Sequence, residues 1–540
     1  MIVSTAITPV AAHEGNDTDS GPSAPTGNVC PFNHSDWRSP DIVAGVQIDP
    51  DPSCNPDNPA VVAAVTAGTN RVPKDVLRQS GLSSDAVVKR NDSDGDGDPD
   101  EIHIRLEVAG LNEYNAAGAF HTIAPGIHPA FWVFVPKTRG MVERNSPAER
   151  LMQMPSPPLR VEQGDTVRVT LANTHYLPHT IHFHGVDHPY MVNGQGNDGV
   201  PQTSEQPILP GERRTYEFTP RKPGTNFYHC HVVPDVHVMM GLNGLFIVAK
   251  NRSDNRVQTI NPGGGRVRHP SAAVDARYDA AYDLQYQDVD ARLHRIPQKL
   301  NDPRAVAAAT NRKYDRTDAD PDFFLLNGRS FPYTLWSSQV IVQPDERYRL
   351  RILNGGSETV SLHTHGHKFT IEAYDGVELT EDQEITRDVV TISAAQRVDL
   401  TLNTTTDGLH SYGRGIWFMH NHREEAVTTN GISPGGDIGL ITYRALLTDN
   451  GMPRTNTNLS QYFDPAFYRG EVPLWADLDP KRLGTPPAPA SASDATATST
   501  SRTTDGTGPP MGRLMQIGLF GLAVFLIGLV VSVLIERRDT

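Results

Sequence analysis

The stretch from Tyr228 to Gly244 concentrates side chains that bind transition metals. Its centre is His229-Cys230-His231, and His237 follows the cysteine within the same stretch. A thiolate together with imidazoles suits copper or zinc. Cys230 and His237 can lie at the two ends of one loop, an arrangement that blue-copper electron-transfer sites use. In an extended strand His229 and His231 point to the face opposite Cys230. We therefore expect them to face a second metal centre.

Two segments of the chain repeat each other without a gap. Residues 161–185 read VEQGDTVRVTLANTHYLPHTIHFHG, and residues 342–366 read VQPDERYRLRILNGGSETVSLHTHG. Each segment ends in an H-x-H pair, and each half of the chain carries one further H-x-H pair. The eight histidines are His182, His184, His229, His231, His363, His365, His420 and His422. Alternate residues of a strand share one face, so each pair offers two neighbouring nitrogens to a metal.

The two halves differ at the candidate cysteine site. The first half carries His179, Cys230 and His237 where the second carries Val360, Asn421 and Thr428. All the H-x-H pairs are retained in both halves. This pattern predicts two separate kinds of metal site, of which the cysteine-containing kind is lost from the second half.

The elements that must position these residues are short strands. From Ile102 the chain becomes a series of β-rich segments interrupted by Gly and Pro, which is typical of a sandwich or barrel. We expect an all-β protein with two homologous sandwich domains. The expected parts are 1–100, an acidic irregular extension; 101–250, domain 1; 251–445, domain 2; 446–484, a C-terminal extension; 485–513, a Ser/Thr/Ala/Pro-rich linker; and 514–535, a transmembrane helix.

The chain resembles multicopper oxidases of the small two-domain, laccase-like kind, which are related to copper nitrite reductases. The resemblance covers roughly residues 102–443 and depends on the motifs HTIHFHG, HCH-x5-H-x3-GL, HTHGH and HNH. It implies cupredoxin-like Greek-key β-sandwiches. It also implies four coppers: a type 1 copper in domain 1, a type 2 copper and a binuclear type 3 pair.

The resemblance assigns ligands to each copper. Type 1 copper would be bound by His179, Cys230 and His237, with Leu242 at the axial position; Met240 is a rival whose spacing does not fit the family. Type 2 copper would be bound by His182 and His363. The type 3 pair would be bound by His184, His229, His231, His365, His420 and His422. His367 fits a hydrogen-bonding group near the ligands, and His175 and His188 fit the surface or the surroundings of the ligands.

The function that the resemblance implies is a copper-dependent oxidase. A small reducing substrate or a redox protein would give electrons one at a time near His237, and O₂ would be reduced to water at the other three coppers. Asp198 lies in a stretch similar to a family segment whose carboxylate relays protons, although Asp-Gly is also an ordinary turn. Family members of this kind form trimers in which domain 1 of one chain meets domain 2 of the next, so we expect a homotrimer.

Three other functions are weighed against this expectation. A copper nitrite reductase would carry Asp at the position of His182 and Ala at the position of His231. An electron carrier would need the type 1 copper but not the eight further imidazoles. A zinc hydrolase normally uses three ligands and an open water position. The phenolic, organic or metal-ion identity of the reducing substrate is left open by the sequence.

The amino-acid composition limits the kinds of partner that the protein is expected to bind. The net charge of -15 argues against nucleic acid and weakly favours cationic substrates. Cys30 and Cys54 are either a disulfide or two unrelated thiols. Asp92, Asp94 and Asp96 either bind Ca²⁺ or belong to a solvated acidic loop.

The C-terminus predicts membrane attachment. Residues 514–535 are an uncharged apolar run long enough to cross a bilayer, and Arg537 and Arg538 place the C-terminus in the cytoplasm. We therefore expect a single-pass protein of the cell membrane with its catalytic domains on the extracellular side. The N-terminal residues do not contain a readable export signal.

Overall fold

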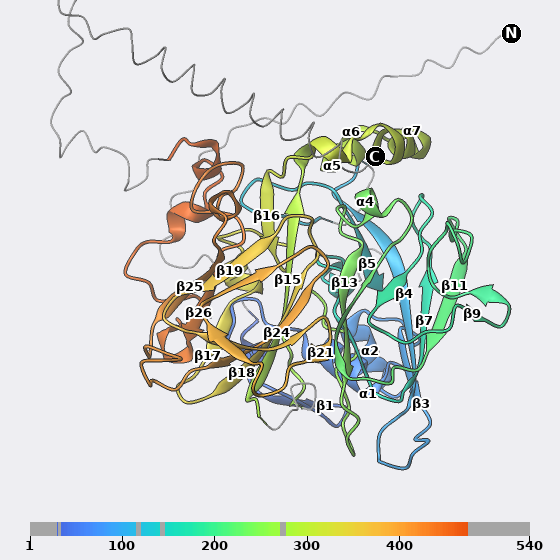
Figure 1. Cartoon of the computed structure of the whole chain (residues 1–540), viewed down its shortest axis with the longest axis horizontal. Helices are drawn as coiled ribbons and strands as arrows, with labels where there is room; N and C mark the ends of the chain where they lie inside the picture. Colours follow the sequence, from blue (N-terminus) through green and yellow to red (C-terminus); the bar gives the residue numbers. More distant parts are fainter. Residues whose placement is uncertain (1–29, 31–33, 115–119, 141–145, 271–276, 473–540) are drawn as a thin grey trace, which may run out of the picture. The chain divides into compact units, whose positions relative to one another are not determined.

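The computed structural model describes residues 30, 34–114, 120–140, 146–270 and 277–472. Apart from the hairpin of β1 and β2, the strands of this part fall into two sets, β3–β13 and β14–β26, drawn from blue to green and from green to orange in Figure 1. Most strand residues of both sets are buried, and the alternating burial along β4 (Glu101–Leu111) is the pattern of a strand that covers a core with one face. The prediction of a β-rich, cupredoxin-like fold is thereby confirmed at this coarse level.

The first set forms two sheets that share one apolar core. One sheet contains β11 (Arg213–Phe218), β7 (Thr166–Ala172), β4, β3 (Val87–Arg90) and β5 (Phe131–Pro136). The other contains β6 (Leu159–Glu162), β13 (Asn243–Ala249), β12 (Gly224–His229) and β8 (His182–His184). A separate small hairpin pairs β9 (Met191–Val192) with β10 (Gln195–Gly196).

The second set repeats this arrangement. One sheet contains β14 (Gly265–Arg266), β15 (Ala280–Val289), β16 (Phe323–Leu326), β18 (Arg347–Asn354), β20 (Phe369–Tyr374), β21 (Val377–Glu378), β22 (Ile385–Arg387) and β24 (Arg397–Asn403). The other contains β17 (Val340–Val342), β19 (Val360–Thr364), β23 (Val389–Ile392), β25 (Ile416–Asn421) and β26 (Gly439–Tyr443). In both sets the H-x-H strands pair antiparallel, β8 with β12 and β19 with β25. The sequence repeat is therefore also a structural repeat.

Buried polar contacts join the two sets of strands. Arg160 of β6 forms an ion pair with Asp283 of β15 at 2.6 Å, and both side chains are fully buried. Asn243 of β13 donates to Gln287 Oε1 at 3.0 Å. Because an unpaired charge at such a site is costly, these contacts favour one fixed arrangement of the two sandwiches.

The expectation of an irregular extension over residues 1–100 is wrong for residues 41–90. This stretch contains β1 (Asp41–Val43), β2 (Val46–Ile48), α1 (Pro59–Ala67), α2 (Lys74–Ser80) and β3. Asn58 caps α1 by accepting from the Ala60 N–H at 3.0 Å. Strand β3 pairs with β4 and so belongs to the first sandwich.

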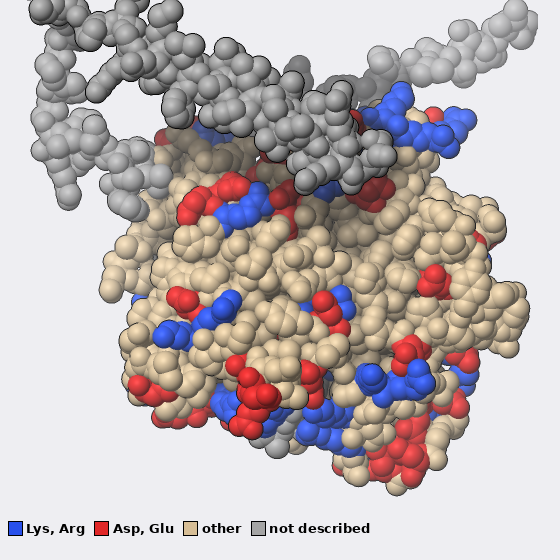
Figure 2. All heavy atoms as spheres, viewed as in Figure 1, with Lys and Arg blue, Asp and Glu red and all other residues tan. Residues whose placement is uncertain are grey.

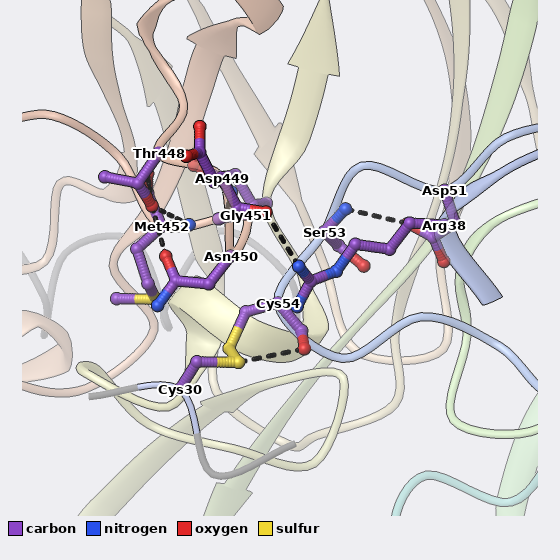
Figure 3. The surroundings of a disulfide bond; sticks show 11 residues. Cys30, Arg38, Asp51, Ser53, Cys54, Thr448, Asp449, Asn450, Gly451 and Met452 are labelled. Atoms are coloured by element: carbon purple, nitrogen blue, oxygen red, sulfur yellow. Dashed lines mark hydrogen bonds between the residues drawn. A yellow bond between two sulfur atoms is a disulfide. The ribbon is translucent and has the colours of Figure 1, made fainter. Parts of the chain in front are cut away.

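A disulfide fixes the start of the described chain. Cys30 and Cys54 are bonded, with their Cα atoms 5.7 Å apart, so the disulfide alternative is confirmed and the alternative of two unrelated thiols is wrong. Figure 3 shows that the neighbouring Arg38 reaches the loop that holds Asp449, where its Nη1 donates to the carbonyl oxygen at 2.8 Å. The N-terminal segment is thus attached to residues that follow the second sandwich.

Short helices connect or cover the strands. They are α3 (Ser146–Glu149), α4 (Pro234–His237), α5 (Ala291–His294), α6 (Ile296–Lys299), α7 (Pro303–Ala308) and α8 (Thr334–Ser337), with single turns η1 (Ser35–Arg38), η3 (Ala309–Lys313), η4 (Arg316–Asp318), η5 (Glu424–Val427), η6 (Arg444–Leu446), η7 (Ser460–Phe463) and η8 (Phe467–Arg469). The expected linker 485–513 and transmembrane helix 514–535 lie outside the described residues. Among the helices that the structure describes, none has the length and apolarity that a membrane span requires.

Candidate metal centres

The cysteine site is assembled from a strand end, a loop and a one-turn helix. Cys230 directly follows β12, His237 ends α4, and His179 lies in the loop before β8. The Cys230 Sγ atom is 3.7 Å from His179 Nδ1 and 3.4 Å from His237 Nδ1. All three side chains are fully buried. One sulfur and two Nδ1 atoms therefore converge on one point, as the chemistry of a metal site requires.

Backbone hydrogen bonds close the loop around this site. The Cys230 N–H donates to the Leu242 carbonyl at 3.0 Å, and the Leu242 N–H donates to the His237 carbonyl at 3.1 Å. Leu242 and Met240 are both fully buried. The loop thus holds its two ligand candidates, Cys230 and His237, at a fixed separation.

A series of close polar contacts lies behind His179. His175 Nδ1 lies 2.9 Å from His179 Nε2, and His175 Nε2 lies 3.6 Å from a carboxylate oxygen of Glu113. The same Glu113 oxygen accepts from Trp132 Nε1 at 2.8 Å and from the Tyr176 hydroxyl at 2.6 Å. His175 is therefore a buried partner of a ligand candidate. Glu113 and Trp132 were not identified from the sequence because they lie far from the motif along the chain.

The first histidine quartet lies on β8, at the end of β12 and just beyond it. His182 and His229 are direct cross-strand partners. His184 Nε2 lies 3.0 Å from His229 Nε2, and the His231 ring centroid is 5.5 Å from those of both His182 and His229. The structure thus brings all four predicted histidines of the first half together.

The second quartet has the same geometry on β19 and β25. His363 and His420 are cross-strand partners, and His365 Nε2 lies 3.2 Å from His420 Nε2. His422 has its ring centroid 5.5 Å from that of His420, and its side chain is 54% exposed. The second quartet is therefore the more open of the two, and one side of it is available to a partner.

Backbone carbonyls fix which ring nitrogen of these histidines is free. His229 Nδ1 donates to the Cys230 carbonyl at 2.9 Å, and His420 Nδ1 donates to the Asn421 carbonyl at 2.9 Å. The Nε2 atoms that face His184 and His365 therefore carry lone pairs. Burial lowers the pKa of His229 to about 3 and the pKa of His184 to about 4. Neutral imidazoles with Nε2 directed inward are the form that binds metal.

The two quartets do not meet within one chain. Among the described residues, the groups able to hold a metal combine histidines of one half only. The ring contacts likewise join His182, His184, His229 and His231 to one another, or His363, His365, His420 and His422 to one another. Each half of the chain thus presents four of the eight expected histidines.

Asp198 lies beside the first quartet. Its carbonyl oxygen accepts from His182 Nδ1 at 2.6 Å, and its carboxylate lies 3.3 Å from His182 Nδ1 and 3.6 Å from His188 Nε2. Asp198 and His188 therefore contact a ligand candidate. His367 is buried in the second half and lies 3.1 Å from the Tyr443 hydroxyl, which suits the hydrogen-bonding role expected for it.

The former cysteine position of the second half is occupied by a hydrogen-bonded amide. The Asn421 side-chain oxygen accepts from the Ser361 and Arg423 N–H groups at 2.9 and 3.2 Å. Val360, at the position equivalent to His179, is buried. Metal-binding groups are absent from this place among the described residues.

The acidic loop brings the carboxylates of Asp92, Asp94 and Asp96 within 4.8 Å of one another. Their oxygens accept hydrogen bonds from backbone N–H groups of the same loop, including those of Gly95 and Gly97. These N–H groups give the carboxylates hydrogen-bond partners without an ion, so the loop does not support the calcium interpretation.

A buried His₂Cys set beside paired H-x-H histidines, on two repeated β-sandwiches, defines a copper protein of the cupredoxin type. Two segments of the chain, residues 151–253 and 297–433, match family models described as "Multicopper oxidase". Two segments of the chain are thus similar to multicopper oxidases, and the resemblance found in the sequence is confirmed at this level. The family implies copper as the metal.

Two curated relatives are similar to parts of the chain. The chain is 29% identical to an iron transport multicopper oxidase FET3 of Gibberella zeae over 54% of this chain and 44% of the relative. It is 24% identical to a dihydrogeodin oxidase of Aspergillus terreus over 58% of this chain and 46% of the relative. The matches thus span less than half the length of these curated relatives.

Two solved structures are similar to the chain. One is a multicopper oxidase, mgLAC, at 25% identity and a TM-score of 0.48, covering 68% of this chain and 92% of that one. The other is the blue copper oxidase from Nitrosomonas europaea, at 25% identity and a TM-score of 0.47, with the same coverage.

Proposed function

We propose that this chain is a copper-dependent oxidase that couples the one-electron oxidation of a reducing substrate to the four-electron reduction of O₂ to water. The observation that carries the proposal is the position of Cys230. Its sulfur belongs to the His₂Cys set, while its two chain neighbours, His229 and His231, belong to the first quartet. A few covalent bonds therefore connect an electron-accepting site to a site that can bind oxygen.

The ligand assignment follows the geometry and the family pattern. We assign His179, Cys230 and His237 to type 1 copper, with Leu242 at the axial position. A hydrophobic axial residue leaves the site without a fourth strong ligand, which favours a high reduction potential. Four coppers per chain complete the family pattern, with His182 and His363 on type 2 copper. The remaining six histidines, assigned to the type 3 pair, are His184, His229, His231, His365, His420 and His422.

An oxygen site that uses both quartets needs a second chain. Because the quartets lie on different sandwiches and His422 is half exposed, domain 1 of one chain must meet domain 2 of another. A ring of such head-to-tail contacts closes as a cyclic oligomer, and we propose a homotrimer.

Asp198 is the proposed proton carrier for oxygen reduction. Its carboxylate lies between His182 and His188, at 3.3 and 3.6 Å. From there it can receive a proton on the solvent side and release it near the first quartet. The alternative is that Asp198 is only part of an Asp-Gly turn. Gly199, which follows it, does have a positive φ.

Two alternative functions remain as competitors. A copper nitrite reductase needs one metal-binding histidine from the second domain, whereas this chain presents four. A simple electron carrier needs neither quartet.

We also propose a single-pass membrane anchor at residues 514–535, with the copper domains outside the cell. The sequence alone supports this proposal.

Oxygen uptake by the copper-loaded full-length chain tests the proposal. Phenols, Fe(II) and Cu(I) would be supplied as donors, and His184→Ala is the matched variant because it removes one quartet ligand and leaves the His₂Cys set intact. We expect oxygen uptake by the parent protein and none by the variant, with the blue colour retained in both. Nitrite consumption without oxygen consumption would favour the reductase instead.

A further inference from the structure

A helical segment covers His237, one of the candidate ligands of the cysteine site. This segment, which we call the cap, runs from residue 291 to residue 318 and contains α5, α6, α7, η3 and η4. Leu293 and Val306 of the cap belong to the apolar core of the first sandwich. Figure 1 places α5–α7 beside α4, the helix that ends in His237. The cap therefore packs against the half of the molecule that holds the cysteine site.

Specific contacts hold the cap in place. His294 Nδ1 donates to the Ala130 carbonyl at 2.6 Å. The Tyr314 hydroxyl donates to Asp290 at 2.8 Å and lies 3.8 Å from the sulfur of Met239, two residues beyond His237. Burial lowers the pKa of His237 to about 3, and the Asn311 side chain of the cap opposes part of this shift. No surface of His237 is exposed, so an electron donor meets the cap and not the imidazole.

The charge of the cap is opposite to that of the whole chain. The chain has a net charge of -15, but within residues 291–318 seven basic residues face three acidic ones. The basic residues are Arg292, Arg295, Lys299, Arg304, Arg312, Lys313 and Arg316, and the acidic ones are Asp302, Asp315 and Asp318.

Part of this positive charge is unpaired. Arg292 is paired with Asp290 and Asp318, and Arg304 with Asp302. The side chains of Arg295, Lys299, Arg312 and Lys313 are exposed, and none of them forms an ion pair with a carboxylate among the residues that the structure describes. Figure 2 shows blue side chains gathered near the place of α7 in Figure 1, the helix that carries Arg304 and continues into η3 with Arg312 and Lys313. We call Arg295, Lys299, Arg312 and Lys313 the basic patch.

We infer that the cap is the docking surface for an acidic one-electron redox protein. This inference rests on the proposed function and names the class of its electron donor. One electron leaves the reduced centre of the partner and converts the copper held by Cys230 from Cu(II) to Cu(I), without a proton or a covalent bond being exchanged. The basic patch attracts and orients the partner, because complementary charge raises association rates and fixes orientation. The local charge thus opposes the preference for cationic substrates that the net charge predicts.

A protein partner fits this surface better than a small donor. The cap is made of short helices whose charged side chains stand outward, and it separates His237 from solvent by a layer of packed side chains. Because His237 is fully buried, a small donor cannot touch this candidate copper ligand directly. A protein that carries its own redox centre needs only a complementary surface near the acceptor.

Anaerobic stopped-flow reduction of the blue chromophore tests the inference. The probe is reduced plant-type two-iron ferredoxin, a small acidic one-electron carrier. The test variant carries Arg295→Glu, Lys299→Glu, Arg312→Glu and Lys313→Glu. The control variant carries the same change of charge on exposed residues outside the cap, Lys74→Glu, Arg78→Glu, Arg213→Glu and Lys222→Glu. We expect the cap variant to react at least about tenfold more slowly than the control at low salt, and the difference to disappear at high salt.

A second readout uses the copper-free protein. Binding of oxidised ferredoxin to the apoprotein, followed by calorimetry at low salt, is expected for the parent and the control variant and not for the cap variant. Equal rates and equal binding in the two variants would overturn the inference. The inference would also be overturned if the cap variant slowed reduction by hexacyanoferrate(II) but not reduction by ferredoxin. The basic patch would then select small anions.

The same preparations separate this inference from the proposed function. Blue colour with oxygen uptake from hydroquinone would uphold the oxidase even where the cap variant behaves like the control. Absence of copper binding in the parent protein would instead remove the proposed function itself.

Discussion

His175 Nδ1 lies 2.9 Å from His179 Nε2, which links a ligand candidate of the cysteine site to the carboxylate of Glu113. Partners of this kind orient metal-binding histidines and affect metal affinity. We expect His175→Leu to lower the affinity of the type 1 site for copper by roughly 10–100-fold. Copper titration of the apoprotein, followed through the blue band, measures the change.

The matched variant for this test is His175→Gln, which retains a hydrogen-bonding side chain. It should restore part of the affinity. Equal titration curves for His175→Leu and the parent protein would show that the contact has no influence on the site.

Cys230 is the proposed sulfur ligand, so Cys230→Ser should abolish the absorption near 600 nm, an approximate value for a Cys–Cu(II) chromophore. Metal analysis should show one copper fewer per chain, because the quartets do not depend on the sulfur. The control is Asn421→Ser, at the equivalent position of the second half, which should retain the colour. A blue Cys230→Ser protein would rule out the assigned site.

The separation of the quartets predicts complementation between inactive chains. His182→Ala and His363→Ala should each abolish oxygen uptake when expressed alone. Coexpressed at equal levels, they should regain about a quarter of the parent activity, because one in four head-to-tail interfaces then joins two intact quartets. Oxygen uptake by the purified mixture measures this. Zero activity in the mixture, with both variants folded and oligomeric, would mean that each oxygen site is built within one chain.

The disulfide between Cys30 and Cys54 closes a loop of 24 residues in sequence separation. On the loop-entropy account, Cys30→Ser combined with Cys54→Ser should lower the free energy of unfolding by about 3 kcal/mol. Denaturant unfolding measures the loss. Addition of a reductant to the parent protein should produce the same loss and should leave the double variant unchanged. A parent protein insensitive to the reductant would contradict the prediction.

The sequence predicts candidate metal sites because their candidate ligands lie within short motifs, and the structure brings these side chains together. His229, Cys230 and His231 are consecutive, and strand alternation alone sends them to two different sites. Glu113 and Trp132 could not be found in this way, since β4 and β5 bring them to the cysteine site from distant parts of the chain. Their placement depends on tertiary contacts that a local pattern does not contain.

The helices that the sequence did not predict lack a readable helical pattern for different reasons. Helix α1 is buried on nearly all sides, so its sequence PAVVAAVTA lacks the polar stripe that indicates a surface helix. Helices α5–α7 of the cap contain only four to six residues each, which is too short for helical periodicity to appear. The acidic composition of residues 1–100 then suggested irregular structure where helices and strands are present.

The amide of Asn421 records how a duplicated domain specialised. Its oxygen now holds the Ser361 and Arg423 backbone, so restoring a cysteine there would break two structural bonds before any metal could bind. Histidines at two further positions would still be required. A cysteine at position 421 alone would therefore cost stability without creating a second electron-transfer site.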